Sequence, residues 1–267
     1  MKTILIATDF SPVSDNVVNY AIQFTENLDA KIILLNVGFL PTVPSEVPQV
    51  IPIDEIIEGS KIQLEAIKKR MNSSFQKPKE IHCEARIGFV SDEIMGCIQD
   101  FKVDLVIVGI QAVDLLSERL FGSNSTALIE KSPVPVLVIP EKSTFNGVRR
   151  IALACENLDF KNDVVTKLDF FLKSFDAELH VVNVAETSGQ NVSEVMVKSL
   201  FNEVEHIYHP LQNTDVITEI QLFLEDNAID MIVTIPQHHG FFYRLFNESK
   251  TKKLAFHVHK PLLAIHA

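Results

Sequence analysis

The sequence predicts an α/β protein of two tandem domains, each a doubly wound parallel sheet flanked by helices. Its length of 267 residues suits about two domains, because one domain takes roughly 150 residues. Short runs of β-branched residues alternate with helical stretches, which is typical of a right-handed βαβ series. A gapless internal alignment joins residues 4–37 to residues 151–184. Together these observations favour a duplicated domain.

The internal alignment sets the expected domain boundaries. In both copies an apolar stripe follows the i, i+4, i+7, i+11 spacing of one helix face. The stripe comprises Val17, Ala21, Phe24 and Leu28, which recur as Val164, Leu168, Phe171 and Phe175. Identical residues include the pairs Ile4/Ile151, Ala7/Ala154, Val18/Val165, Asp29/Asp176, Ala30/Ala177, Asn36/Asn183 and Val37/Val184. We therefore predict domains at 1–142 and 148–267, which are called the first repeat and the second repeat below.

Strands and helices of the first repeat follow from its apolar pattern. Nearly continuous apolar runs indicate four strands buried on both faces, at 3–8, 31–37, 104–108 and 134–139. A run that alternates between apolar and polar residues indicates a fifth strand at 81–87. A helix is expected over 54–72, and another over 91–101 with Ser91 as its N-cap. Residues 38–53 contain four well-spaced prolines, so this connection is expected to be an extended loop.

Composition excludes several classes of protein. The formal net charge is −11 and no long basic run occurs, which argues against nucleic-acid binding. No apolar run approaches the roughly 20 residues that span a bilayer, and the first residues do not resemble a signal peptide. The three cysteines form no CxxC pair and suggest neither disulfides nor a zinc site. We therefore expect a cytoplasmic protein that binds no nucleic acid and no membrane.

Two loops of the first repeat hold the candidate site. In open parallel sheets, ligands bind beyond the carboxyl ends of the strands, where residues 7–11 and 109–125 lie. Gly122 lets the backbone approach an anion, and Ser123, Asn124 and Ser125 then start a helix whose free N–H groups favour phosphate. Taken alone, this segment is more often an ordinary N-cap than a phosphate site. Asp9 alone is likewise more often a cap of the next helix than a ligand-binding residue.

The spacing of these residues resembles that of the universal stress protein family. ATP-binding members carry Gly-x2-Gly-x9-Gly-Ser/Thr after the fourth strand, and this chain has Gly109-x2-Ala112-x9-Gly122-Ser123. The opening segment 4–21 and the closing segment 132–140, SPVPVLVIP, are equally typical of the family. The resemblance covers 1–141 and, more faintly, 148–267. It implies a fold of the adenine-nucleotide alpha-hydrolase-like type, with five parallel strands in the order 3-2-1-4-5 in each repeat.

The resemblance also implies an ATP site in the first repeat. Ala7, Thr8 and Asp9 would hold adenine and ribose, with Asp9 accepting from a ribose hydroxyl. Val37 and Val108 would line the adenine pocket. The triphosphate, with Mg²⁺ or another divalent metal on its oxygens, would be wrapped by Gly109, Gly122, Ser123, Asn124 and Ser125. Ala112 replaces the second glycine of the motif, and we expect this change to weaken or alter binding without abolishing it.

The second repeat departs from the ATP motif. The similar segments 104–108 and 230–234 align Asp104 with Asp230. In this alignment Ile235 stands where Gly109 does, His238 replaces Ala112, and Glu248-Ser249 replaces Gly122-Ser123. Likewise Glu156 replaces Asp9 and Cys155 replaces Thr8. We expect no ATP binding there in the family manner. Because family members pair through their last strands, we expect segments 134–139 and 260–265 to join the repeats as an intramolecular pseudo-dimer, which leaves a further homodimer open.

Three functions remain open at this level. The leading one is an ATP-binding stress-response regulator, and the alternatives are a weak ATP-hydrolysing enzyme and an interaction or assembly module without nucleotide. Catalytic motifs are absent, so no catalytic residue is assigned and enzyme activity is the less favoured alternative. Histidines gather late in the chain, at positions 206, 209, 238, 239, 257, 259 and 266. They could form a metal site, but solvated loop positions are the favoured interpretation, and no metal ligand is assigned.

Overall fold

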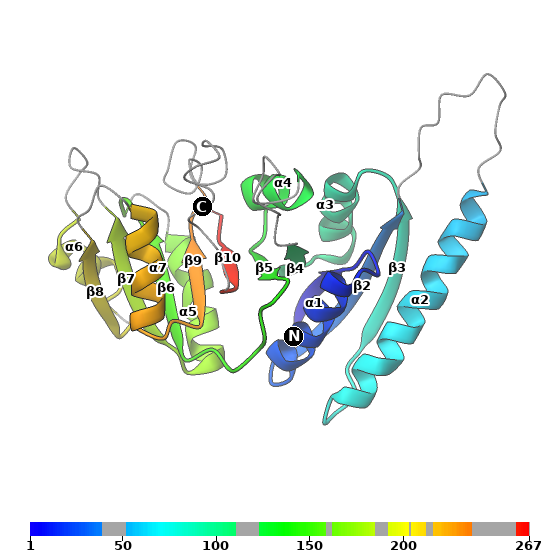
Figure 1. The fold of residues 1–267 in the computed structure, drawn as a ribbon, viewed down its shortest axis with the longest axis horizontal. Coiled ribbons are helices and arrows are strands. Elements are labelled where there is room, and N and C mark those ends of the chain that lie inside the picture. The colour runs from blue at the N-terminus through cyan, green and yellow to red at the C-terminus, as the bar shows by residue number, and fades with distance from the viewer. Residues whose placement is uncertain are drawn as a thin grey trace, which may run out of the picture. The chain divides into compact units, whose positions relative to one another are not determined.

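The computed structural model describes residues 1–38, 52–110, 123–158, 162–184, 192–202, 204–211, 216–236 and 260–266. The chain divides into two compact units, Met1–Gly109 and Ile110–Ala267. Each unit has a mostly parallel sheet with flanking helices, which confirms the predicted α/β class (Figure 1). The predicted domain boundaries at 142 and 148 do not coincide with the division between these units, and they remain a prediction.

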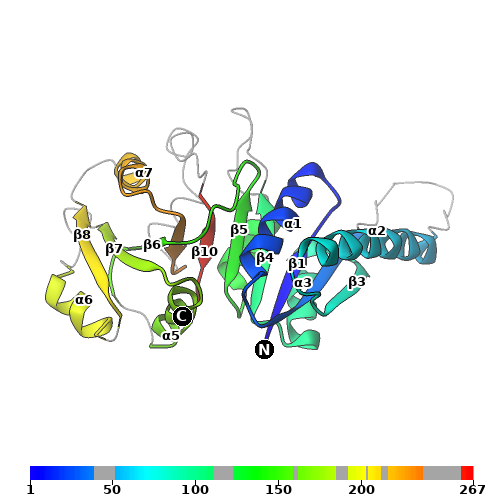
Figure 2. The same ribbon diagram turned by 90° about the horizontal axis from the view of Figure 1, so that it is seen from below.

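The first unit contains most of the first repeat. Its strands are β1 (Lys2–Ala7), β2 (Ala30–Gly38), β3 (Ile81–Ile87) and β4 (Leu105–Ile110, whose last residue opens the second unit). They pair in parallel in the order β3-β2-β1-β4, as predicted. The helices are α1 (Pro12–Thr25), α2 (Ile53–Ser74) and α3 (Val90–Phe101). α1 and α2 pack on one face of the sheet and α3 on the other (Figure 2).

The second unit begins with the end of the first repeat and contains the whole second repeat. Its sheet has the order β5-β10-β9-β6-β7-β8. The strands are β5 (Val136–Pro140), β6 (Arg150–Cys155), β7 (Glu178–Val184), β8 (His206–Leu211), β9 (Met231–Thr234) and β10 (Leu262–Ala264). The helices are α4 (Ser123–Lys131), α5 (Asn162–Phe175), α6 (Glu194–Leu200) and α7 (Val216–Asp226). Counted within the second repeat, the strand order is again 3-2-1-4-5, as predicted. Figure 2 shows α5 and α7 on opposite sides of β6 and β7.

The last strands of the two repeats pair directly. β5 and β10 are antiparallel, with Leu262 opposite Val138 and Ala264 opposite Val136. All residues of these two strands are buried, and β10 also pairs in parallel with β9. The expected pairing of 134–139 with 260–265 is therefore confirmed. It explains why β5 belongs to the second unit although its sequence belongs to the first repeat.

An aspartate before the fourth strand serves the same purpose in both repeats. Asp104 accepts a hydrogen bond from the backbone N–H of Thr3 at 2.8 Å. Its counterpart Asp230 accepts from the N–H groups of Arg149 and Arg150 at 2.8 and 3.0 Å. Each carboxylate thereby holds the start of the first strand beside the fourth, which is the neighbouring strand of the sheet. The sequence similarity at these positions thus reflects a shared structural contact.

One expected helix start is wrong. α3 begins at Val90, and its N-cap is Phe89, which makes no side-chain cap hydrogen bond. The backbone N–H of Glu93 already donates to the C=O of Phe89 at 3.0 Å, so Ser91 lies within the first turn instead of capping it. The Ser-Asp-Glu pattern predicted the cap, but Gly88 ends the strand early enough for the helix to start before the serine. Helix 54–72 is confirmed as the slightly longer α2.

Two histidines of the second repeat form a hydrogen-bonded pair on neighbouring strands. Nδ1 of His180 on β7 lies 3.1 Å from Nε2 of His209 on β8, and the ring planes are 4° apart. Phe223 of α7 packs against His209 with its ring centroid 4.7 Å away. Glu178 Oε2 lies 3.3 Å from the other nitrogen of His180. Burial, together with the nearby His180, lowers the pKa of His209 below its ordinary value, although Glu178 acts in the opposite direction.

This pair predicts a loss of stability in mild acid. Because the pKa of His209 is lower in the folded chain, the unfolded chain binds the proton first as the pH falls below about 6.5. The free energy of unfolding should therefore fall between pH 7.5 and pH 5.5, measured by urea denaturation. His209→Gln should show a shallower pH dependence than the wild type. Equal slopes for His209→Gln and the wild type would contradict this account.

Candidate functional site

The predicted adenosine residues of the first unit lie at one edge of its sheet. Ala7 ends β1 opposite Leu35 of β2, and Ile6 lies opposite Ile107 of β4. Val37, Val108 and Gly109 therefore lie at the same carboxyl edge as Ala7, Thr8 and Asp9. From β1 the chain crosses to β2 on one side, whereas β4 lies on the other, which makes this edge a topological switch point. The structure thus brings these predicted residues together.

A buried asparagine holds the end of β1 in place. The side-chain amide of Asn36 donates to the C=O of Thr8 at 2.8 Å, and the N–H of Thr8 donates to the C=O of Leu35 at 2.9 Å. In the second repeat, Asn183 donates to the C=O groups of Cys155 and Glu156 at 3.1 and 3.2 Å. Both repeats therefore keep an asparagine side chain that hydrogen-bonds the backbone at the end of the first strand. The sequence comparison found the identical asparagines but not their contact.

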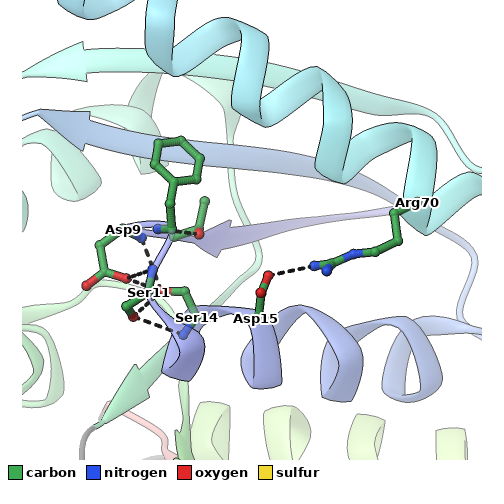
Figure 3. A network of polar contacts seen from close by, with 7 residues as sticks. Asp9, Ser11, Ser14, Asp15 and Arg70 are labelled. Carbon is green, nitrogen blue, oxygen red and sulfur yellow. Dashed lines mark hydrogen bonds and ion pairs between the residues drawn. The ribbon is translucent and has the colours of Figure 1, made fainter.

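Two serines fix the carboxylate of Asp9 (Figure 3). Its Oδ1 accepts the backbone N–H of Ser11 at 3.0 Å and also the hydroxyl of Ser14. The hydroxyl of Ser14 in turn accepts the N–H of Asp9 at 3.1 Å. Ser11 is the N-cap of α1 and accepts the N–H of Ser14 at 3.2 Å. The side chain of Asp9 is thus immobilised at the start of α1 by its Oδ1 atom.

The serine contacts also set the charge of Asp9. Partial burial raises its pKa, but the hydrogen bonds from Ser11 and Ser14 outweigh this effect and hold the pKa below its ordinary value. The carboxylate is therefore ionised at neutral pH and acts only as an acceptor. Within the described part of the chain, its side-chain hydrogen bonds all end on Oδ1. Oδ2 of this exposed residue takes part in neither of these contacts.

The turn between Asp9 and Ser11 has an unusual backbone. Phe10 adopts a φ of 63°, in the left-handed region that a residue with a Cβ rarely occupies. Such a conformation costs on the order of 1–2 kcal/mol. The N–H of Phe10 donates to the hydroxyl of Thr8 at 3.1 Å, which helps to hold it. Strained residues of this kind gather at ligand sites, and this one lies beside the fixed carboxylate.

Gly109 has a packing reason to be glycine. A Cβ placed on it would lie 2.7 Å from Cγ2 of Val17 and 3.1 Å from Cγ1 of Val13, both on α1. The glycine therefore lets α1 approach the end of β4 closely. The sequence assigned Gly109 to triphosphate binding, and the structure adds a steric requirement that does not depend on any ligand.

Except for Gly109, which ends the first unit, the predicted phosphate residues belong to the second unit. Ala112 and Gly122 are outside the described residues. α4 begins at Ser123, so Ser123, Asn124 and Ser125 occupy its first turn, and Ser125 is buried. The first N–H groups of a helix have no partner within it and carry the positive end of its dipole. The backbone of this turn therefore lies at the positive end of the helix dipole, and phosphate binding by it stays a prediction.

The second repeat lacks the serine-bound aspartate of the predicted adenosine site. Cys155 is buried at the position of Thr8, and burial, helped by Glu156, raises the pKa of its thiol to about 12. Ile235 fills the position of Gly109 and is also buried. Leu158 and Lys161 stand where Ser11 and Ser14 fix Asp9, so the serines are replaced together with the aspartate. His238, Glu248 and Ser249 lie outside the described residues.

No metal site emerges in the part of the chain that the structure describes. No group of three or more His, Cys, Asp or Glu side chains there could hold an ion. His206 lies on β8 and contacts the C=O of Val204 at 2.8 Å, whereas His238, His239, His257 and His259 are outside the described residues. All three cysteines are free, and Cys83 is only half-buried. None of the described helices has both the length and the apolar character that crossing a bilayer requires.

Ser11, Ser14 and Asn36 are functional candidates that the sequence did not reveal. A Ser-Pro pair before an apolar stripe is a helix-start signal and could have identified Ser11 as the cap. The contact of Ser14 with Asp9 could not be inferred in this way, because it depends on the left-handed turn at Phe10. Asn36 could have been noticed as a polar residue inside an apolar strand.

Comparison with known proteins gives this doubly wound α/β fold a family. The family model of the universal stress protein family matches residues 1–140. A universal stress protein of Methanocaldococcus jannaschii is 33% identical over 91 residues, which cover 34% of this chain and 54% of that protein. A second one from the same organism is 30% identical over 143 residues, covering 52% and 81%.

A solved structure resembles the whole chain. A universal stress protein from Archaeoglobus fulgidus matches 99% of this chain and 98% of its own, with a TM-score of 0.73 and 16% sequence identity. At this identity the likeness concerns the fold, including its two tandem repeats. With the family model covering more than half of the sequence, the chain belongs to the universal stress protein family.

The packing of Gly109 leads to a stability prediction. Gly109→Ala should lower the free energy of unfolding by roughly 1–3 kcal/mol, because the new methyl group collides with Val13 and Val17. Gly59→Ala in α2 is the matched control: no atom lies within 4 Å of its added Cβ, and alanine favours a helix by up to about 1 kcal/mol. Urea denaturation of both variants measures the difference. A Gly109→Ala protein as stable as the wild type would contradict the described packing.

Proposed function

We propose that the first repeat binds ATP and that the protein is a nucleotide-dependent regulator in a stress response. Asp9 would accept from a ribose hydroxyl, Ala7, Thr8, Val37 and Val108 would surround adenosine, and the phosphates would meet the segment 109–125. A divalent metal such as Mg²⁺ would be held on the phosphate oxygens. Three free cysteines support a cytoplasmic location, where thiols stay reduced.

The fixed carboxylate of Asp9 carries this proposal. Ser11 and Ser14 hold Oδ1, and the lowered pKa keeps the group ionised, so that Oδ2 presents a charged acceptor in a set position. A sugar hydroxyl is a donor that such an acceptor binds well, since charge-assisted hydrogen bonds are about twice as strong as neutral ones. A phosphate would be repelled by Asp9. Sugar and phosphate must therefore go to different ends of the site.

In this proposal the first turn of α4 would bind the phosphates. Ser123, Asn124 and Ser125 occupy that turn, and the first N–H groups of a helix favour an anion. In a chain with a net charge of −11, such a local positive end is needed to attract a triphosphate. Ala112 adds a methyl group to the loop, so we expect the wild type to bind ATP less tightly than a variant with glycine at this position. An Ala112→Gly protein would be the natural comparison.

Loss of the Asp9 carboxylate should weaken ATP binding. Asp9→Ala removes a charge-assisted hydrogen bond worth about 1.5–3 kcal/mol, so the Kd should rise roughly 10- to 100-fold in isothermal calorimetry with Mg-ATP. Asp9→Asn keeps an acceptor for Ser11 but loses the charge, and it should weaken binding while preserving the fold.

Asp15→Ala is the matched control for the carboxylate. Asp15 lies on α1, the helix that follows Asp9, and forms an exposed ion pair with Arg70 at 2.9 Å (Figure 3). Exposed pairs contribute little, so this variant should bind ATP as the wild type does. A wild-type protein that does not bind ATP would overturn the proposed function. An unchanged Kd for Asp9→Ala and Asp9→Asn would overturn the role of Asp9.

A further inference from the structure

A histidine of the second repeat caps the last turn of α4. The final four C=O groups of a helix have no partner within it, and those of Leu128 and Ile129 belong to this set. The N–H of Ser132 donates to the C=O of Leu128 at 3.0 Å. The C=O of Ile129 lies 2.6 Å from Nε2 of His266, 137 positions away in the sequence. His266 thus satisfies a group that would otherwise be left without a partner.

The histidine is itself anchored to the second repeat. His266 follows β10, and its backbone C=O accepts from Nζ of Lys167 on α5 at 3.2 Å. Lys167 also pairs with Asp163 one turn earlier, at 2.6 Å. A continuous series of contacts therefore runs from α5 through His266 to the carboxyl end of α4. The antiparallel pairing of β10 with β5, the strand that follows α4, is a second link between the strand that precedes His266 and α4.

The ring of His266 acts as a neutral donor. Burial lowers its pKa, against the opposing effect of the hydrogen bond to Ile129. A carbonyl oxygen only accepts, so Nε2 must carry the proton. A donor at the negative end of the helix dipole is favourable. The contact therefore does not require the histidine to be charged.

The first repeat has no histidine at the position of His266. In the alignment that matches Asp104 with Asp230, Pro140 stands at the position of His266. A proline side chain has no donor, so it cannot cap a helix of the second repeat in this way. The contact of His266 with Ile129 thus runs from the repeat that departs from the ATP motif to a helix of the repeat that retains most of it.

We propose that His266 is a positioning residue through which the second repeat sets the orientation of α4 and hence the nucleotide affinity of the first repeat. The inference rests on the proposed function, in which the first turn of α4 meets the phosphates. α4 has nine residues and is therefore only about 13 Å long. In so short a helix, a shift at the carboxyl end displaces the amino end as well.

Three variants test the proposal: His266→Ala, His266→Gln and His206→Ala. Glutamine can still donate an N–H to the C=O of Ile129. His206 makes a similar contact, 2.8 Å to the C=O of Val204, elsewhere in the second repeat, and is the matched control. The readouts are the Kd for Mg-ATP by calorimetry and the hydrogen exchange of α4 amides by mass spectrometry, with β6 and β7 as internal reference.

His266→Ala should raise the Kd about 3- to 10-fold, as expected for one lost hydrogen bond, and should accelerate exchange in α4 but not in β6 or β7. His266→Gln should keep the Kd and the exchange of α4 close to their wild-type values, and His206→Ala should change neither the Kd nor the exchange. Unchanged exchange in α4, or faster exchange with an unchanged Kd, would overturn the inference. A wild type that binds no ATP overturns the proposed function instead, and the positioning role then stands or falls with the exchange of α4 alone.

Discussion

The antiparallel pairing of β5 with β10 is the interaction on which the second unit depends. It removes the exposed edges of two short, fully apolar strands, which would otherwise invite aggregation. It also fixes the strand that follows α4, because Ser132 joins helix and strand by a tight turn in which its hydroxyl donates to the C=O of Val134 at 2.7 Å. The same pairing brings the chain after β10 to the last turn of α4, where His266 makes its contact.

The two repeats have kept their architecture and diverged in their chemistry. Asp104 and Asp230 hold the first strand of each repeat, and Asn36 and Asn183 hold the loop that follows it. These contacts maintain the strand order and the carboxyl edge regardless of any ligand. The fixed carboxylate of Asp9 has been replaced, together with its serines, in the second repeat. The second repeat has thus kept the backbone contacts of the fold without the aspartate site, as expected if it positions α4 of the first repeat.

Much of the fold could be predicted because buried parallel strands leave a strong apolar pattern, and because the repeat shows it twice. The predicted start of α3 was wrong because Ser91 offered a local cap signal, whereas the helix starts at Val90, soon after β3 ends at Ile87. At the site, the sequence identified Asp9 but not its immobilisation by Ser14, which requires the left-handed backbone of Phe10. The contact of His266 with Ile129 joins distant segments and leaves no local pattern.

The central claim is an asymmetry: the first repeat binds nucleotide and the second supports it. The most direct measurement is the stoichiometry of Mg-ATP binding by titration calorimetry on the full chain. The fixed Asp9 and the first turn of α4 predict close to one ATP per chain, because Cys155, Glu156 and Ile235 replace the corresponding groups of the second repeat. A stoichiometry near two, or one ATP that remains bound when Asp9 is replaced and is lost when Glu156 is replaced, would contradict this account.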